Sequence, residues 1–312
     1  MFSVIFPGQG SQSVGMGKDL LQNYQVVKEL FKEADDSLKF SFSNLIINGP
    51  KDELDKTENT QPAIFLIGYS IFKLLKKEFG IDLNKAEFFA GHSLGEYTAL
   101  SCSGAISFLD TLNLLKKRGK AMQSALPLGE GGMLAVLGTN IEKVENILKN
   151  NEDKYNCYVA NDNSNLQSVV SGKIKDLDLF AEDLKKNSIK SIKLSVSAPF
   201  HCKYMSKATE IMKNEIANLN FNTLSNKIIS NVTGKEVENI IEIKKLLVDQ
   251  IESRVRWRES ILYMVNKKIN KFIEIGPGKV LNGLIKRIDK NVEVVSINEV
   301  KEMNELKNNG FL

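Results

Sequence analysis

Hydrophobic residues occur along this chain in two alternating patterns. Short continuous apolar runs, typical of strands buried on both faces, alternate with longer stretches in which apolar residues recur at helical spacing. The short runs predict strands at 2–6, 86–90, 226–230, 271–275 and 292–297. The longer stretches predict helices near 18–34, 62–79, 107–124, 203–219, 240–253 and 257–267. Pro62 should lie in the first turn of the second helix, where proline is favoured. The alternation predicts an α/β fold with a mostly parallel sheet.

The segment between residues 128 and 197 has shorter elements in a different order. Its pattern predicts strands at 133–137, 156–160, 167–171 and 189–196, and helices at 141–149 and 177–186. The order βαββαβ is that of a ferredoxin-like module. Pro127 and a glycine cluster mark its entry, and Ala198-Pro199 marks its exit. We therefore predict a small ferredoxin-like domain at 128–197, inserted into a larger domain formed by 1–127 and 198–312.

The composition of the 312 residues is that of an ordinary globular protein, with 42% apolar and 26% charged residues. The net charge of +4 is small and the lysines are scattered, which argues against nucleic acid as a partner. No apolar stretch approaches the length of a membrane span. The three cysteines form no CxxC pair, so we expect a reducing compartment and no metal site. Because the chain begins directly with a predicted strand, we expect a cytoplasmic protein, or one of a plastid-type organelle if a transit segment has been removed.

The segment Gly91-His92-Ser93-Leu94-Gly95-Glu96 contains the only Gly-x-Ser-x-Gly sequence in the chain. It follows a predicted strand and precedes a helix-like stretch, which is the context of a nucleophile elbow. In such a turn the serine lies at a helix N-terminus, where backbone amides favour developing negative charge. A second interpretation stays open. Ser93 and Glu96 also have the spacing of a capping box, in which Ser93 would only begin the helix.

A nucleophilic serine needs a base, and the chain has only two histidines. His92 lies inside the predicted turn and should point away from the serine, which leaves His201. Cys202 is a rival nucleophile, but neighbours in sequence point apart, so it makes no Cys–His pair with His201. The acidic candidates for a third triad member, none with a distinguishing context, include Asp110, Asp162 and Asp178. A dyad oriented by a backbone or amide oxygen is an equal alternative.

Two further features bear on the chemistry. Arg118 lies at the edge of an apolar stripe on the predicted helix 107–124 and should be partly buried. Either its stem covers apolar surface while its head reaches water, or it grips a carboxylate with two parallel hydrogen bonds, as lysine cannot. The loop at 7–12 offers free backbone amides. It is not a dinucleotide loop, because Ser13 occupies the place of the third glycine.

Six motifs together resemble those of the malonyl-CoA:acyl carrier protein transacylases, in the same order and over essentially the full length. They are Phe6–Gln12 (FPGQGSQ), Asn59–Ala63 (NTQPA), Gly91–Tyr97 (GHSLGEY), Lys117–Met122 (KRGKAM), Phe200-His201 with Met205, and Glu274–Leu281 (EIGPGKVL). Any one would be weak evidence, whereas six in register are specific. The resemblance implies an α/β-hydrolase-like large domain with a ferredoxin-like insert, which agrees with the pattern above.

The resemblance also implies a role for individual residues. Ser93 is similar to the nucleophile that takes the malonyl group as an ester, and His201 is similar to its base. Arg118 is similar to the arginine that holds the malonyl carboxylate. Gln250 is similar to a residue whose main-chain carbonyl orients the histidine, so that no acidic third member would be needed.

The implied reaction is a ping-pong transfer of malonyl from malonyl-CoA to the phosphopantetheine thiol of acyl carrier protein, which feeds fatty acid biosynthesis. The backbone N–H groups of Gln9 and Leu94 would form the oxyanion hole. Phe200 would crowd an α-substituent and favour malonyl over methylmalonyl. The resemblance implies no cofactor of the enzyme's own and an acidic carrier protein as partner. A monomer is one expected state.

Two other functions stay open at this point. A serine esterase or thioesterase would use the same Ser93 and His201, although Arg118 argues against simple ester substrates. A non-catalytic module that binds a carrier protein would use Ser93 only as a helix cap. The sequence does not distinguish fatty acid from polyketide synthesis.

Overall fold

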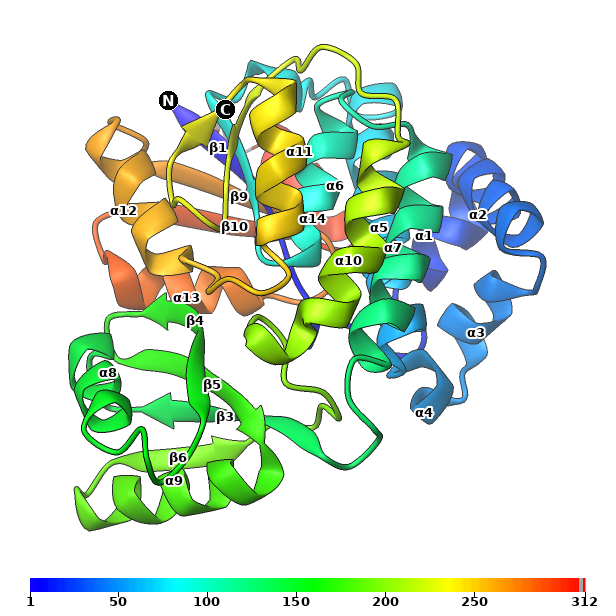
Figure 1. Cartoon of the computed structure of the whole chain (residues 1–312). Helices are drawn as coiled ribbons and strands as arrows, with labels where there is room; N and C mark the ends of the chain where they lie inside the picture. Colours follow the sequence, from blue (N-terminus) through cyan, green and yellow to red (C-terminus); the bar gives the residue numbers. More distant parts are fainter. Residues whose placement is uncertain (309–310, 312) are drawn as a thin grey trace.

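The computed structural model describes residues 1–308 and 311, and a six-stranded sheet lies at its centre (Figure 1). The strands are β1 (Phe2–Phe6), β2 (Phe88–Gly91), β7 (Lys227–Ile229), β8 (Glu236–Val237), β9 (Lys271–Ile275) and β10 (Glu293–Ile297). They lie in the order β10-β9-β1-β2-β7-β8, and every neighbouring pair is parallel except β7 with β8. The carboxyl ends of β1 and β2 therefore lie side by side.

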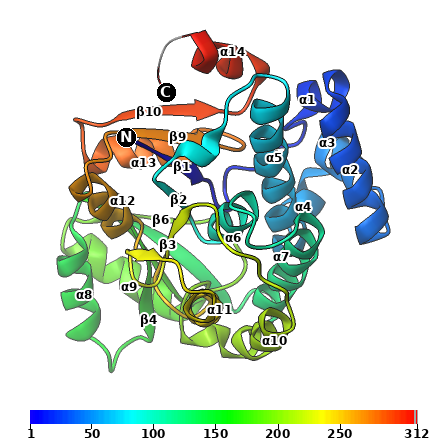
Figure 2. The same cartoon turned by 90° about the horizontal axis from the view of Figure 1, so that it is seen from above.

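Helices cover both faces of this sheet (Figure 2). Successive strand residues point to opposite faces, so Val4 and Phe6 join one hydrophobic core while Ile5 joins the other. The helices on the larger core are α1 (Lys18–Asn23), α2 (Gln25–Leu38), α3 (Phe42–Asn48), α4 (Lys51–Leu54), α5 (Thr57–Lys77), α6 (Leu94–Cys102), α7 (Phe108–Gln123), α10 (Ser206–Ala217), α11 (Ile240–Asp249) and α14 (Val300–Asn308). Those on the smaller core are α12 (Trp257–Asn266) and α13 (Val280–Ile288). In the described part of the chain, no helix has the length and apolar character needed to cross a membrane.

A second, four-stranded antiparallel sheet lies below the first in Figure 1. Its strands are β3 (Gly131–Leu137), β4 (Cys157–Ser164), β5 (Gln167–Lys173) and β6 (Lys190–Lys193), in the order β4-β5-β3-β6. Two helices, α8 (Ile141–Lys149) and α9 (Ile174–Lys186), share a core with it. Backbone hydrogen bonds join β4 to the large part of the chain, because Asp162 N donates to Val255 O (2.9 Å) and Val255 N donates to Ala160 O (2.8 Å).

Several helix bounds differ from the prediction. The stretch near 18–34 forms two helices, because Tyr24 between them is extended, with φ −123° and ψ 125°. The helix predicted to start at Pro62 begins at Thr57, so the predicted start is wrong and Pro62 lies inside α5. Tertiary packing overrides the local preference of proline here. Most of α5 is buried, and the side chains of Asn59 and Thr60 tie its start to preceding carbonyl groups. The sequence pattern also misses α3, α4 and α14.

Helices α5 and α7 approach each other closely at Gly119. A Cβ at this position would lie 2.4 Å from Thr57 O and 2.6 Å from the Glu58 Cα. Backbone atoms cannot rotate away, so Gly119→Ala should push the helices apart and lower the free energy of unfolding by about 1–3 kcal/mol. Urea unfolding measures this change.

Gly283→Ala in α13 is the matched control, because nothing lies within 4 Å of its Cβ position. Alanine should there raise the free energy of unfolding by about 0.8–1 kcal/mol through helix propensity. Equal stability of the two variants would contradict the close approach of α5 and α7.

Candidate active site

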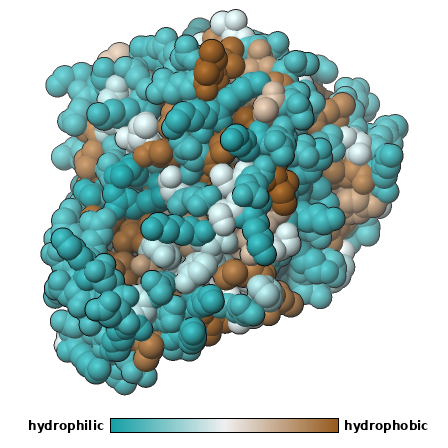
Figure 3. All heavy atoms as spheres, in the orientation of Figure 1, coloured by the Kyte–Doolittle hydropathy of each residue, from teal (hydrophilic) through white to brown (hydrophobic). Residues whose placement is uncertain are grey.

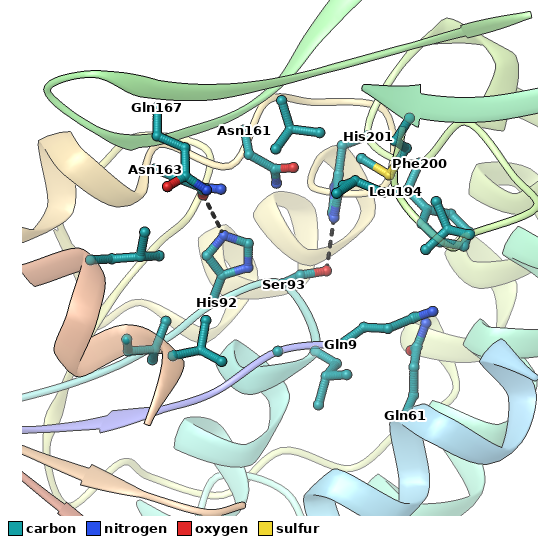
Figure 4. A pocket seen from close by; sticks show the side chains of 18 of the residues that line it. Gln9, Gln61, His92, Ser93, Asn161, Asn163, Gln167, Leu194, Phe200 and His201 are labelled. Carbon is teal, nitrogen blue, oxygen red and sulfur yellow. Dashed lines mark hydrogen bonds between the residues drawn. The ribbon is translucent and has the colours of Figure 1, made fainter. Parts of the chain in front are cut away.

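A cavity of about 170 Å³ lies between the two parts of the chain, at the carboxyl ends of β1 and β2 (Figure 4). Its lining includes Gln9, Ser93 and His201, with Asn163 from the small sheet. The surface is hollowed where the small part meets the large one, and hydrophobic residues show at this hollow (Figure 3). Ligands of parallel α/β sheets bind outside the carboxyl ends of strands, so this cavity is the candidate site.

Ser93 occupies a sharp turn between β2 and α6. Its backbone has φ 53° and ψ −109°, a conformation that residues other than glycine rarely adopt. Close contacts explain the flanking glycines. A Cβ at Gly91 would lie 1.9 Å from the carbonyl carbon of Gly95, and one at Gly95 would lie 2.2 Å from Phe6 O. The predicted strand, tight turn and helix are therefore present, with Ser93 at the cavity.

The capping box is absent. The side chain of Ser93 makes no capping hydrogen bond to α6. The Glu96 carboxylate instead accepts hydrogen bonds from Asn231 N (3.1 Å) and Gln250 Nε2 (2.7 Å). Burial raises the pKa of Glu96 to about 7. Ser93 is the N-cap residue of α6 by position, but its hydroxyl faces other partners, so the interpretation in which its side chain only caps the helix is wrong.

His201 points toward Ser93 at the wall of the cavity (Figure 4). Ser93 Oγ lies 2.8 Å from His201 Nε2, and the carbonyl oxygen of Gln250 lies 2.8 Å from His201 Nδ1. A carbonyl oxygen only accepts, so Nδ1 carries the proton and Nε2 is left to accept from the serine hydroxyl. Burial lowers the pKa of His201 to about 3, and the positive charge of Arg118 adds to the effect. The imidazole is therefore neutral near pH 7.

The acidic candidates for a third triad member have other partners: Asp110 with Ser107, Asp162 with Arg258, and Asp178 with Lys193. The carbonyl of Gln250 occupies the place beside His201 Nδ1 that an acidic residue takes in a triad. This arrangement favours the alternative of a dyad oriented by a backbone oxygen. Among residues 1–308 and 311, no three His, Cys, Asp or Glu side chains are grouped so that they could hold a metal ion.

Arg118 is fully buried, whereas the sequence predicts only partial burial. Its Nη1 donates to Gln61 Oε1 (2.8 Å), and its Nη2 donates to Gln250 Oε1 (2.8 Å) and to Ser93 Oγ (3.1 Å). The guanidinium also lies over the ring of Tyr97, 5.1 Å from its centre. The interpretation in which the head reaches water is therefore wrong. All these acceptors are neutral, and Nε has no partner within the described residues.

The second histidine and the neighbouring cysteine are engaged elsewhere. His92 Nε2 lies 2.9 Å from Asn163 Oδ1 and its ring packs beside Trp257, so it points away from Ser93 as predicted. Cys202 Sγ donates to a backbone carbonyl, and burial raises the pKa of this thiol to about 12. A thiol with that pKa is not ionised near pH 7, so Cys202 is a poor nucleophile.

Gln9, Leu94 and Phe200 all line the cavity. Leu94 is the first residue of α6, and N–H groups in the first turn of a helix have no acceptor within it. Gln9 lies in the loop that follows β1. The end of β1 adjoins the turn that contains Ser93, because His92 N donates to Phe6 O (3.0 Å). The two residues named for the oxyanion hole therefore line the same cavity as Ser93.

Two residues that organise the site have no role in the sequence analysis. Asn231 accepts a hydrogen bond from Ser93 N, and Gln61 accepts one from Arg118. Asn231 directly follows the predicted strand 226–230, and a polar residue at the carboxyl end of a parallel strand is a signal that points to the site. Gln61 lies within the motif Asn59–Ala63 that contributes to the resemblance, which marks the segment but gives the residue no role.

Comparison with known proteins adds to this geometry. Residues 3–306 match the family model described as "Acyl transferase domain". A malonyl CoA-acyl carrier protein transacylase from Haemophilus influenzae is 40% identical over 304 residues, which cover 97% of each chain. The crystal structure of an acyl-carrier-protein-S-malonyltransferase from Bartonella henselae has a TM-score of 0.95 at 37% identity and covers 98% of both chains.

A third relative was solved with a partner. A malonyl-transacylase in complex with its type II PKS acyl-carrier protein has a TM-score of 0.95 at 33% identity, over 99% of both chains. The family model and the relatives all span nearly the whole of this chain. The chain therefore belongs to the acyl transferase domain family, and malonyl CoA-acyl carrier protein transacylases are among its relatives.

Proposed function

We propose that this chain transfers a malonyl group from malonyl-CoA to the phosphopantetheine thiol of acyl carrier protein, and that this transfer feeds fatty acid biosynthesis. The names of its relatives support both the acyl group and the carrier. The observation that carries the proposal is the position of Ser93 Oγ. It lies 2.8 Å from the imidazole of His201 and 3.1 Å from the buried guanidinium of Arg118. The imidazole suits acyl transfer, and the guanidinium suits an acyl group with a carboxylate.

The transfer proceeds in two halves. His201 takes the proton of the Ser93 hydroxyl as Oγ attacks the thioester carbonyl of malonyl-CoA. The N–H groups of Gln9 and Leu94 stabilise the oxyanion. The C–S bond then breaks, and protonated His201 returns its proton to the CoA thiolate. In the second half His201 takes the proton of the carrier's thiol as its sulfur attacks the malonyl ester. The C–O bond to Ser93 then breaks and His201 returns the proton to Oγ, so the kinetics are ping-pong.

Arg118 selects the acyl group. Its guanidinium now donates to neutral amide and hydroxyl oxygens, and its Nε has no partner among the described residues. A malonyl carboxylate would pair with this buried charge through charge-assisted hydrogen bonds. An acetyl group has no carboxylate and would leave the charge unpaired, which is costly in a buried site.

The remaining features refine the proposal. Phe200, at the cavity wall beside the base, crowds an α-substituent and favours malonyl over methylmalonyl. The net charge of +4 suits an acidic carrier protein, which itself brings the phosphopantetheine, so the enzyme needs no cofactor of its own. The strand order β4-β5-β3-β6 supports a ferredoxin-like domain at 128–197, and the larger sheet supports an α/β-hydrolase-like domain at 1–127 and 198–312.

Mass spectrometry after incubation with malonyl-, methylmalonyl- or acetyl-CoA tests the proposal. Without acceptor, we expect a stable malonyl adduct on Ser93 and little adduct from the other two thioesters. Acyl carrier protein bearing phosphopantetheine should then discharge the adduct and become malonylated. Rapid multiple turnover of malonyl-CoA without acceptor would instead indicate a thioesterase. The absence of any adduct would indicate a non-catalytic carrier-binding module.

The low pKa of His201 predicts a flat acid limb in the pH profile of Ser93 acylation. A base with an ordinary imidazole pKa of about 6.5 would slow acylation roughly 50-fold between pH 6.5 and 4.5. Burial lowers the pKa of His201 to about 3, so the ring stays neutral across this range. The single-turnover rate constant should therefore change less than about 2-fold. Circular dichroism at each pH controls for unfolding, and a tenfold fall in a folded protein would contradict the prediction.

A further inference from the structure

We propose that Glu96 and Asn231 are positioning residues of the malonyl transfer, which hold the backbone of Ser93 and the side chain of Gln250 in the orientation that the chemistry needs. The inference rests on the proposed function and deepens it. Glu96 and Asn231 are 2% and 1% exposed, and neither lines the cavity. Any effect they have on the reaction must therefore pass through the residues that touch the substrate.

The side chain of Asn231 is hydrogen-bonded to the backbone of the turn that contains Ser93. Its Oδ1 accepts a hydrogen bond from Ser93 N (2.7 Å), and its Nδ2 donates one to Gly91 O (2.7 Å). One side-chain amide thus joins the backbone on both sides of His92. Ser93 has a positive φ of 53°, and a strained residue persists only where its surroundings over-determine it. These two hydrogen bonds are part of that restraint.

Glu96 connects Asn231 to Gln250 through hydrogen bonds. Glu96 Oε2 accepts from the backbone N of Asn231 (3.1 Å) and from Gln250 Nε2 (2.7 Å). Gln250 Nε2 also lies 3.1 Å from Ser93 O and 3.3 Å from Asn231 Oδ1. The side chains of Glu96, Asn231 and Gln250 are nearly inaccessible to water, so a water molecule does not readily replace a lost hydrogen-bond partner.

Gln250 in turn contacts the groups proposed for the chemistry. Its carbonyl oxygen accepts from His201 Nδ1 (2.8 Å), and its side-chain Oε1 accepts from Arg118 Nη2 (2.8 Å). The amide of Gln250 is therefore held at one end by Glu96 and holds Arg118 at the other. The resemblance assigns a role only to the carbonyl of Gln250. We extend a positioning role to the side chain of Gln250 and to the two residues that contact it, Glu96 and Asn231.

Removal of the Glu96 carboxylate should disturb this arrangement. Glu96→Ala leaves the backbone N–H of Asn231 buried without its acceptor, which is costly. It also removes the shortest hydrogen bond of Gln250 Nε2, so this side chain should shift toward its remaining acceptors, Ser93 O and Asn231 Oδ1. Glu96→Gln is the matched control. Both hydrogen bonds of Glu96 reach the same oxygen, Oε2, and the amide oxygen of a glutamine can occupy that place.

The experiment is single-turnover acylation of the full chain by malonyl-CoA, followed by quenched mass spectrometry. The amplitude reports the fraction of competent enzyme, and the rate constant reports the geometry of the site. We expect Glu96→Ala to lower the rate constant by about 10–100-fold at near-normal amplitude, because a displacement of about 1 Å has effects of this size. Glu96→Gln should stay within about 5-fold of the wild type. A fall in amplitude with an unchanged rate constant would show that Glu96 only stabilises the fold and would overturn the inference.

A second variant keeps the test decisive if Glu96→Ala does not fold. Asn231→Asp has the same shape and can still accept from Ser93 N, but it cannot donate to Gly91 O. We expect its rate constant to fall roughly 10-fold at normal amplitude, and a wild-type rate constant would overturn the inference. The unmodified chain, measured in parallel, distinguishes failure of the proposed function from failure of the positioning role. If it forms no malonyl adduct, the proposed function fails, whereas a normal adduct with unaffected variants refutes only the positioning role.

Discussion

Replacement of Ser93 with alanine should abolish the malonyl adduct and lower malonyl transfer by roughly 10⁶-fold, the effect that loss of the serine nucleophile has in a serine protease. Alanine has no oxygen to form the ester, and His201 Nε2 loses the hydroxyl that lies 2.8 Å away. The remaining cavity and backbone N–H groups would still bind the thioester. Intact-protein mass spectrometry measures the adduct, and transfer to acyl carrier protein measures the rate.

Ser101→Ala is the matched control for this variant. Ser101 lies on the same helix, α6, is 4% exposed, and its hydroxyl has no hydrogen-bond partner in the described part of the chain. Its loss should leave both the adduct and the transfer rate within about 2-fold of the wild type, because no hydrogen bond is broken. A malonyl adduct that persisted in Ser93→Ala would place the ester on another residue and exclude the proposed mechanism.

Replacement of Arg118 with alanine should remove the preference for malonyl over acetyl. The loss of one partner from a buried charge pair costs about 3–4 kcal/mol, so kcat/KM for malonyl-CoA should fall by roughly 10²–10³-fold. Transfer from acetyl-CoA should fall much less, since acetyl has no carboxylate for the guanidinium to bind. The malonyl-to-acetyl ratio of kcat/KM is the measurement to make. Partial unfolding lowers both values equally and cancels in this ratio.

Arg118→Lys separates charge from geometry. Lysine keeps the positive charge but cannot make the two parallel hydrogen bonds of a guanidinium, nor reach Gln61 and Gln250 together as Arg118 does. We expect the malonyl-to-acetyl ratio of this variant to lie between those of the wild type and Arg118→Ala. An unchanged ratio in Arg118→Ala would contradict a role for this residue in binding the malonyl carboxylate.

The parts of the site that depend on local sequence could be predicted. Strand β9 and helix α8 have the predicted bounds, 271–275 and 141–149, because each has a clear apolar period and a marked end. The elbow could also be predicted, because the steric need for glycine on both sides of Ser93 is expressed within five residues. With only two histidines in the chain, His201 followed by elimination.

Local patterns failed where packing decided the outcome. Pro62 has the local character of a helix start, yet α5 begins earlier because its first turns are buried and tied down by neighbouring segments. The spacing of Ser93 and Glu96 fits a capping box, yet Glu96 is drawn to partners that follow β7 and α11. In both cases distant contacts outweigh the local preference, which is worth about 1 kcal/mol for a helix cap and about 3 kcal/mol for proline inside a helix.

The sequence by itself determined the α/β alternation, the inserted βαββαβ segment, the tight turn at Ser93 and the choice of His201 as the histidine paired with it, because these follow from periodicity, backbone sterics and composition. Only the tertiary structure decided that Arg118 is fully buried beside Ser93, and that the carbonyl of Gln250 rather than an acidic side chain lies beside His201 Nδ1. It also decided that Asn231 contacts the backbone of Ser93 and that Glu96 contacts the side chain of Gln250. The physical reason is separation along the chain. Ser93 and Asn231 are 138 positions apart, and Arg118 and Gln250 are 132 apart, so the order of parallel strands and the packing of helices bring them together.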